Sequence, residues 1–99
     1  MNLSLADQLL LKDFFSGVPV KKAYLFGSRA RNEANESSDF DILVELDHSK
    51  PIGMKFFTYQ SELALLLKKK VDLVSSDGLS PHISPIIDLE KVLIYERAD

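Results

Sequence analysis

The distribution of apolar residues along the chain predicts short helices that alternate with short strands. Helical spacing predicts one helix between the cap Ser4 and Gly17, a second over residues 54–69, and a short third one from Ser84 onward. Strand formers are concentrated in four ranges, the last of them a tentative edge strand: 20–26, 39–46, 71–74 and 92–95. A brief helical stretch is expected at 28–33, with loops at 32–38 and 75–84.

This order predicts an α/β (α+β) fold, in which helices flank a small mixed β-sheet. The 99 residues fit a single domain, residues 1–99. The inward-facing residues of the first two helices are expected to be Leu5, Leu9, Phe14 and Phe15, and then Phe56, Phe57, Leu63, Leu66 and Leu67.

Composition and charge exclude several classes of protein. The net charge of −3 and the scattered basic residues argue against direct nucleic-acid binding. The sequence has no cysteine, no signal-peptide pattern and no apolar run near the ~20 residues of a membrane span, so we expect a cytoplasmic protein with no membrane association. A domain this short buries a modest share of its surface, which favours a homodimer or a hetero-oligomer.

Two acidic residues stand at the start of a predicted buried strand. Side chains alternate along a strand, so Asp39 and Asp41 project from the same face and Phe40 from the other. Two carboxylates this close repel each other unless a cation lies between them. A hard divalent cation with oxygen ligands, Mg²⁺ or Mn²⁺, is the natural partner.

A third acidic residue, Asp72, lies in the apolar segment VDLV. If that strand pairs beside the Asp39–Asp41 strand, Asp72 joins the same cluster. Three converging carboxylates can hold one or two metal ions for an in-line phosphoryl displacement.

The turn after the first strand adds a second feature. Gly27 allows the backbone to approach a ligand closely, and Ser28 adds a hydroxyl. A short helix after such a turn presents free N–H groups, which suit a phosphate. Each of these features has a bland structural explanation, as a turn, a cap or a solvated acid, and only their combination indicates a site.

The segment GSRARNEANESSDFDILVEL resembles the signature of the DNA polymerase β-like nucleotidyltransferase superfamily. Its spacing, Gly-Ser, ten residues and Asp-x-Asp, is similar to that of the minimal nucleotidyltransferases (MNT), as is the tail KKKVDLVSSDGLSPHISPIIDLEKVLIYE. One departure is Asn32, where the family commonly has glycine; asparagine also tolerates positive φ.

The resemblance implies a role for each matching residue. Gly27, Ser28 and, less strongly, Arg29 would bind the phosphates of a nucleoside triphosphate such as ATP. Asp39 and Asp41 would ligate Mg²⁺. Asp72 would complete the metal site and help deprotonate an acceptor hydroxyl. Arg31 falls at another position where the family often has a basic residue.

Many MNT proteins are antitoxins of HEPN-domain toxins, so the resemblance implies transfer of AMP from ATP to a tyrosine of a cognate HEPN toxin. Two alternatives stay open. The protein could neutralise its partner by binding alone, or it could modify a small molecule, although larger relatives that do so carry an additional acceptor domain.

Overall fold

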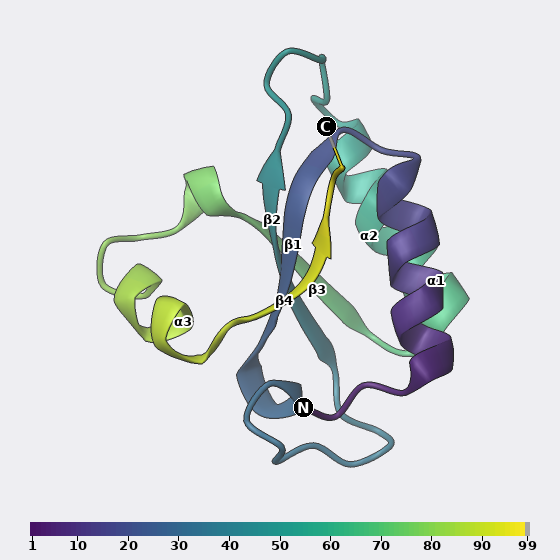
Figure 1. Cartoon of the computed structure of the whole chain (residues 1–99). Helices are drawn as coiled ribbons and strands as arrows, with labels where there is room; N and C mark the ends of the chain where they lie inside the picture. Colours follow the sequence, from purple (N-terminus) through teal and green to yellow (C-terminus); the bar gives the residue numbers. More distant parts are fainter. Residues whose placement is uncertain (99) are drawn as a thin grey trace.

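The computed structural model describes residues 1–98 and shows one mixed four-stranded sheet with helices on both faces (Figure 1). Helices α1 and α2 cover one face, and the short α3 lies across the other. The elements, in chain order, are α1 (Leu5–Ser16), β1 (Val20–Phe26), the 3₁₀ turn η1 (Gly27–Arg29), β2 (Phe40–Leu46), α2 (Lys55–Leu67), β3 (Val71–Ser75), the 3₁₀ turn η2 (Ser76–Gly78), α3 (Ser84–Glu90) and β4 (Val92–Glu96). The predicted fold class is confirmed.

The strand order is β3-β2-β1-β4. Strand β1 pairs antiparallel with both β2 and β4, whereas β2 and β3 are parallel and joined by the crossover helix α2. The parallel pairing sets Asp41 directly opposite Asp72, and the antiparallel pairing sets Phe26 opposite Asp41. The end of β1 and the starts of β2 and β3 therefore meet at one edge of the sheet.

The main core lies between the sheet and helices α1 and α2. Its buried members are Leu11, Phe15, Val20, Ala23, Leu25, Phe40, Ile42, Val44, Leu63, Leu67, Val71, Leu73 and Ile94. Leu43 of β2 and Ile87 of α3 are also buried, although they lie outside this cluster. The pattern leaves one sheet face sealed by two helices and the other only partly covered.

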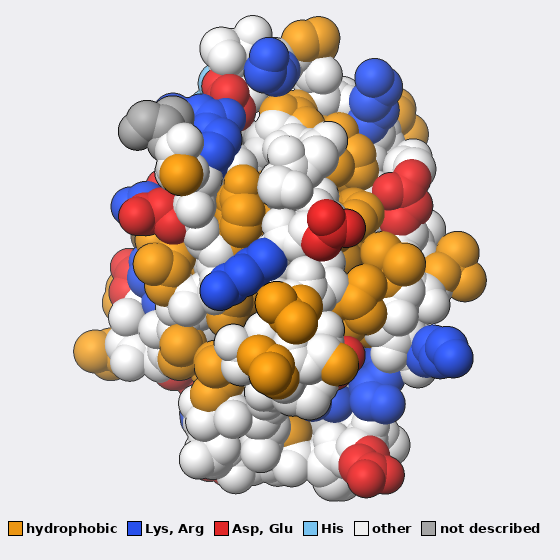
Figure 2. All heavy atoms as spheres, turned by 45° about the vertical axis from the view of Figure 1, so that its right-hand side comes forward, with side chains coloured by type: hydrophobic (Ala, Val, Ile, Leu, Met, Phe, Trp, Pro, Cys, Tyr) orange, Lys and Arg blue, Asp and Glu red, His pale blue; other side chains and the backbone are white. Residues whose placement is uncertain are grey.

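Two predicted inward faces are partly wrong. Leu5 and Leu9 are 71% and 59% exposed, and Phe57 and Leu66 are 62% and 46% exposed. In α1 the prediction is right for Phe15, which is buried, and it missed Leu11, which is buried one turn earlier. Apolar residues therefore reach the surface on the side that carries α1 and α2 (Figure 2).

The helix ends follow local chemistry. The Ser4 hydroxyl accepts a hydrogen bond from the Asp7 N–H, as predicted for an N-cap. Helix α2 ends at Leu67, two residues earlier than expected, because Lys68 adopts a left-handed conformation with φ of 56°. The helical stretch expected at 28–33 is the 3₁₀ turn η1, and the loop expected at 75–84 contains η2 and Ser84, the first residue of α3. Within residues 1–98, no helix combines the length and the apolar content that crossing a bilayer requires.

Candidate active site

Asp41 and Asp72 occupy matching positions on the parallel strands β2 and β3. Side chains at paired positions project from the same face of a sheet, and Asp39 lies two residues before Asp41. Between them, Phe40 is fully buried in the core on the opposite face. The structure therefore puts all three carboxylates on the face away from α1 and α2, as the alternation predicts.

Asp41 is at the centre of this acidic group. Burial raises the pKa of its carboxyl above the ordinary value, and the charges of Asp72 and Asp39 raise it further. The side chain of Asp39 is half exposed, and one of its oxygens lies 3.9 Å from Nζ of Lys70. The repulsion among the three carboxylates therefore acts most strongly on Asp41.

The donor chemistry of this group fits a hard divalent cation, which would relieve the repulsion around Asp41. Across residues 1–98, however, no three His, Cys, Asp or Glu side chains are gathered as a ready-made metal site. The predicted metal ligation stays a prediction.

Gly27 lies directly beside Asp41. Its φ of +75° belongs to the left-handed region that favours glycine. A Cβ at this position would overlap Oδ2 of Asp41 and lie 3.1 Å from Cγ. Only glycine therefore lets the turn pass this close to the carboxylate.

The turn η1 starts at Gly27, whose carbonyl accepts hydrogen bonds from the N–H groups of Ala30 and Arg31. In the described chain, the Ser28 hydroxyl has no hydrogen-bond partner, so it is available to a ligand. Asn32 has φ of 63°, so asparagine does take the left-handed conformation in the place where related sequences carry glycine. The assignment of Gly27 and Ser28 to nucleotide binding stays a prediction that this geometry permits.

Arg29 has a different setting from the one expected of a phosphate ligand. Its side chain is buried, and its guanidinium lies 3.9 Å from the centroid of the Phe40 ring. The guanidinium donates to four backbone carbonyls, those of Asn2, Asn35, Ser38 and Asp39, at 2.9–3.4 Å. Arg29 thus fixes the loop that leads into β2; its predicted contact with the nucleotide is untested.

Glu90 is the site residue that the sequence did not indicate. Its Oε1 accepts a hydrogen bond from the Gly27 N–H at 2.9 Å, and its Oε2 accepts one from Nη1 of Arg31 at 2.8 Å. The hydrogen bond from Arg31 is the main reason that the pKa of Glu90 lies below its ordinary value. One signal existed: an acidic residue at the C-terminus of a helix opposes the helix dipole and needs another partner.

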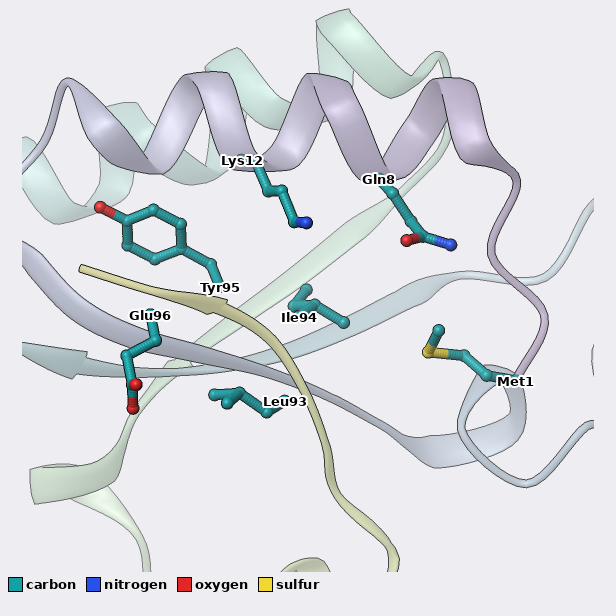
Figure 3. A pocket seen from close by; sticks show the side chains of 7 residues that line it. All are labelled: Met1, Gln8, Lys12, Leu93, Ile94, Tyr95 and Glu96. Atoms are coloured by element: carbon teal, nitrogen blue, oxygen red, sulfur yellow. The ribbon is translucent and has the colours of Figure 1, made fainter. Parts of the chain in front are cut away.

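Two hollows in the described part of the molecule are separate from this acidic face. One, of about 410 Å³, lies between α1 and β4, where Gln8 and Lys12 reach toward Ile94 and Tyr95 (Figure 3). A second hollow, of about 590 Å³, lies between the N-terminal residues and the loop that leads from Arg29 into β2. Neither is lined by Asp39, Asp41 or Asp72. Asp39 and Asp72 are exposed at the surface, and Asp41 is partly buried between them.

Comparison with known families shows the family of this chain. The family model described as polymerase beta, nucleotidyltransferase matches residues 10–99. The chain belongs to this nucleotidyltransferase family. The family resemblance of the sequence is therefore confirmed, and the assignment of the aspartates and the glycine turn to its site stays a prediction.

Individual relatives of this nucleotidyltransferase agree. A protein of Methanocaldococcus jannaschii, provisionally named a protein adenylyltransferase, is 47% identical over 77 residues, 77% of this chain and 76% of the relative. A solved toxin–antitoxin structure with AMP-PNP has a TM-score of 0.79 at 19% identity, over 92% of this chain and 74% of the other. A complex of tri-AMPylated Shewanella oneidensis HEPN toxin with an MNT antitoxin has a TM-score of 0.64 at 20% identity, over 91% and 73%. The two structural likenesses show a shared fold.

Proposed function

We propose that this nucleotidyltransferase transfers AMP from ATP to a tyrosine hydroxyl of a cognate HEPN-type toxin, and that it acts as the antitoxin of that partner. The observation that carries the proposal is the in-register pair Asp41 and Asp72 beside the Gly27 turn. The AMPylated toxin in a structurally similar complex supports a protein acceptor, as does the exposure of Asp39 and Asp72.

Asp39, Asp41 and Asp72 would hold Mg²⁺, with Mn²⁺ as a substitute. A bound divalent ion supplies charge neutralisation at the α-phosphate and at the leaving pyrophosphate. Gly27 and Ser28 would bind the phosphate oxygens through the backbone and the free hydroxyl. The gathered negative charge at Asp41 is the reason that these residues suit a cation–triphosphate complex better than a free anion.

The transfer step exchanges one bond at the α-phosphorus of ATP for another. The acceptor oxygen forms a bond to the α-phosphorus of ATP, and the bond from that phosphorus to the bridging oxygen of the β-phosphate breaks. Pyrophosphate leaves with the electron pair. Asp72, the most exposed position of the in-register pair, takes the proton of the acceptor hydroxyl.

The test is label transfer from α-³²P-ATP to the protein that copurifies with the chain or is encoded beside it, in Mg²⁺ buffer. We expect covalent label on the partner with the wild-type chain and none with the double variant Asp39→Ala, Asp41→Ala. Asp13→Ala is the matched control, since this carboxylate is exposed on α1, behind the sheet. It should label as the wild type does.

Absence of label with ATP, GTP, CTP and UTP, while the complex still forms, would remove the catalytic proposal and leave an antitoxin that acts by binding. Label on a small hydroxyl compound but never on the partner protein would instead support the small-molecule reading.

A further inference from the structure

The carboxylate of Glu90 bridges two donors that lie about sixty residues earlier in the chain. One oxygen is held by the backbone N–H of Gly27 at 2.9 Å and the other by Nη1 of Arg31 at 2.8 Å. The Glu90 side chain is only 18% exposed, whereas that of Arg31 is 44% exposed. A single anion is therefore held from two sides, within the turn that faces Asp41.

These two donors form a site of the type that binds phosphate. A backbone N–H in a tight turn together with a guanidinium fork is a donor set that suits a tetrahedral oxyanion as well as a carboxylate. The position also matches the expected substrate, because Gly27 touches the carboxylate that would hold the cation of a cation–triphosphate complex. We define the Gly27 N–H and the Arg31 guanidinium as the anion seat.

Arg31 and the Gly27 N–H stabilise the Glu90 carboxylate itself, but its charge has a cost for the neighbouring aspartate. Its charge acts on Asp41 in the same unfavourable direction as those of Asp72 and Asp39. It also ends α3, where the negative end of the helix dipole opposes a carboxylate. A residue that merely braced the turn would not need to bring a fourth negative charge to this place, so the charge itself calls for an explanation.

We propose that Glu90 stands in for a phosphate group of the substrate: it fills the anion seat while the site is empty and is displaced by the triphosphate of the nucleotide. The inference rests on the proposed function and adds a regulatory contact to it. Displacement frees the Gly27 N–H and Arg31 to bind a phosphate. It also moves the Glu90 charge away from the three aspartates at the moment when the cation arrives.

The chain offers a matched control. Glu33 also pairs with Arg31, through Nε at 3.0 Å, but it is exposed and does not reach Gly27. Glu90→Gln and Glu33→Gln thus remove the same charge from the same guanidinium, and only Glu90→Gln removes the anion from the seat.

The experiment measures binding of ATP and of inorganic tripolyphosphate in Mg²⁺ buffer by calorimetry, for the wild type and both variants. The apparent affinity of the wild type equals the intrinsic affinity multiplied by the fraction of molecules in which Glu90 has left the anion seat. If that fraction is near one tenth, Glu90→Gln should bind both probes about tenfold more tightly. Glu33→Gln should change affinity by less than about threefold, the effect of one screened surface charge.

Unchanged or weaker binding by Glu90→Gln, or an equal gain in Glu33→Gln, would overturn the proposal. The Gly27 amide resonance gives a readout that a loss of folding cannot imitate. We expect it to differ between wild type and Glu90→Gln without ligand and to converge when both are saturated with tripolyphosphate. Persistence of the difference at saturation would mean that Glu90 is not displaced.

Label transfer by the wild type, run in parallel, separates this inference from the proposed function. If the wild type labels its partner and Glu90→Gln gains no affinity, only the role of Glu90 is wrong. If none of the proteins binds ATP or tripolyphosphate and no label transfers, both the anion seat and the nucleotidyl transfer are wrong.

Discussion

Replacement of Gly27 by alanine tests the contact on which the site depends. The added methyl group has two effects. It forces a residue with a Cβ into φ of +75°, and it places that Cβ on Oδ2 of Asp41. The carboxylate has to move, since the turn backbone is tied by the hydrogen bonds to the Gly27 carbonyl and by Glu90.

The magnitude has two parts. The left-handed conformation costs a residue with a Cβ roughly 1–2 kcal/mol. Overpacking against a neighbour costs typically about 1–3 kcal/mol more. We therefore expect Gly27→Ala to lower the free energy of unfolding by about 2–5 kcal/mol in total. Small domains have a free energy of unfolding of about 5–15 kcal/mol. If the wild type lies in the upper part of this range, Gly27→Ala still folds and its loss of stability can be measured.

Gly53→Ala separates the two parts. Gly53 has φ of +50°, and no atom lies within 4 Å of the Cβ that alanine would add. Only the conformational cost of about 1–2 kcal/mol applies there. The free energies of unfolding of the two variants, measured in urea, should differ by the cost of displacing Asp41. Only Gly27→Ala should abolish label transfer to the partner.

A double variant completes the test. Asp41→Ala removes the two nearest atoms that the new methyl group would meet, Oδ2 and Cγ, and leaves Cβ at 3.3 Å. Gly27→Ala should therefore cost less in that background than in the wild type, by most of the overpacking part of about 1–3 kcal/mol. Equal costs in both backgrounds, or equal losses for Gly27→Ala and Gly53→Ala, would refute the reasoning.

Three further variants test other parts of the structure. Asp72→Asn in metal-free buffer should raise the melting temperature at pH 7. The pKa of Asp41 is raised in the folded protein, so stability is lost as the pH rises from the ordinary pKa of 3.8 through the raised one, and removal of the Asp72 charge restores part of it. The gain should vanish below pH 3.8, and a constant gain at every pH would contradict this origin. Arg29→Lys should lower the free energy of urea unfolding by on the order of 2 kcal/mol, since an ammonium cannot reach the separated carbonyls that the guanidinium joins; wild-type stability would rule out the bracing role. Lys68→Gly should raise that free energy by about 0.5–1 kcal/mol because the left-handed helix end suits glycine, and a loss would show that the Lys68 side chain stabilises the end.

The parts of the site that follow local rules could be predicted from sequence. Alternation along a strand is enough to put Asp39 and Asp41 on one face, and the fully buried Phe40 confirms it. Asp72 required one additional assumption, that its strand pairs beside β2, and the register supports it. The position of Gly27 before a tight turn was likewise local, although its contact with Asp41 was not visible.

The remaining parts depend on tertiary contacts. Glu90 reaches Gly27 because β4, which follows Glu90, pairs with β1, which ends one residue before that glycine. No periodicity along the chain encodes this meeting. The sequence suggested that Arg29 is available to a phosphate, whereas its guanidinium donates to carbonyls of the loop before β2. That loop has no regular structure, so sequence patterns do not predict these hydrogen bonds. The exposure of Leu5 and Leu9 has a similar origin, since sequence spacing indicates an apolar stripe but not the side of a helix that meets the sheet.

The attachment of Asn2 has a practical meaning for anyone who labels or immobilises this protein. Its N–H donates to the Arg29 carbonyl at 2.7 Å, its carbonyl accepts from Arg29, and its side chain accepts from the Ala34 N–H. An affinity tag or fluorophore joined ahead of Asn2 would therefore emerge beside the loop that leads to the aspartates. Strand β4, the last described element, runs toward the opposite end of the sheet (Figure 1), so a fusion placed after it would leave the face that carries the aspartates clear.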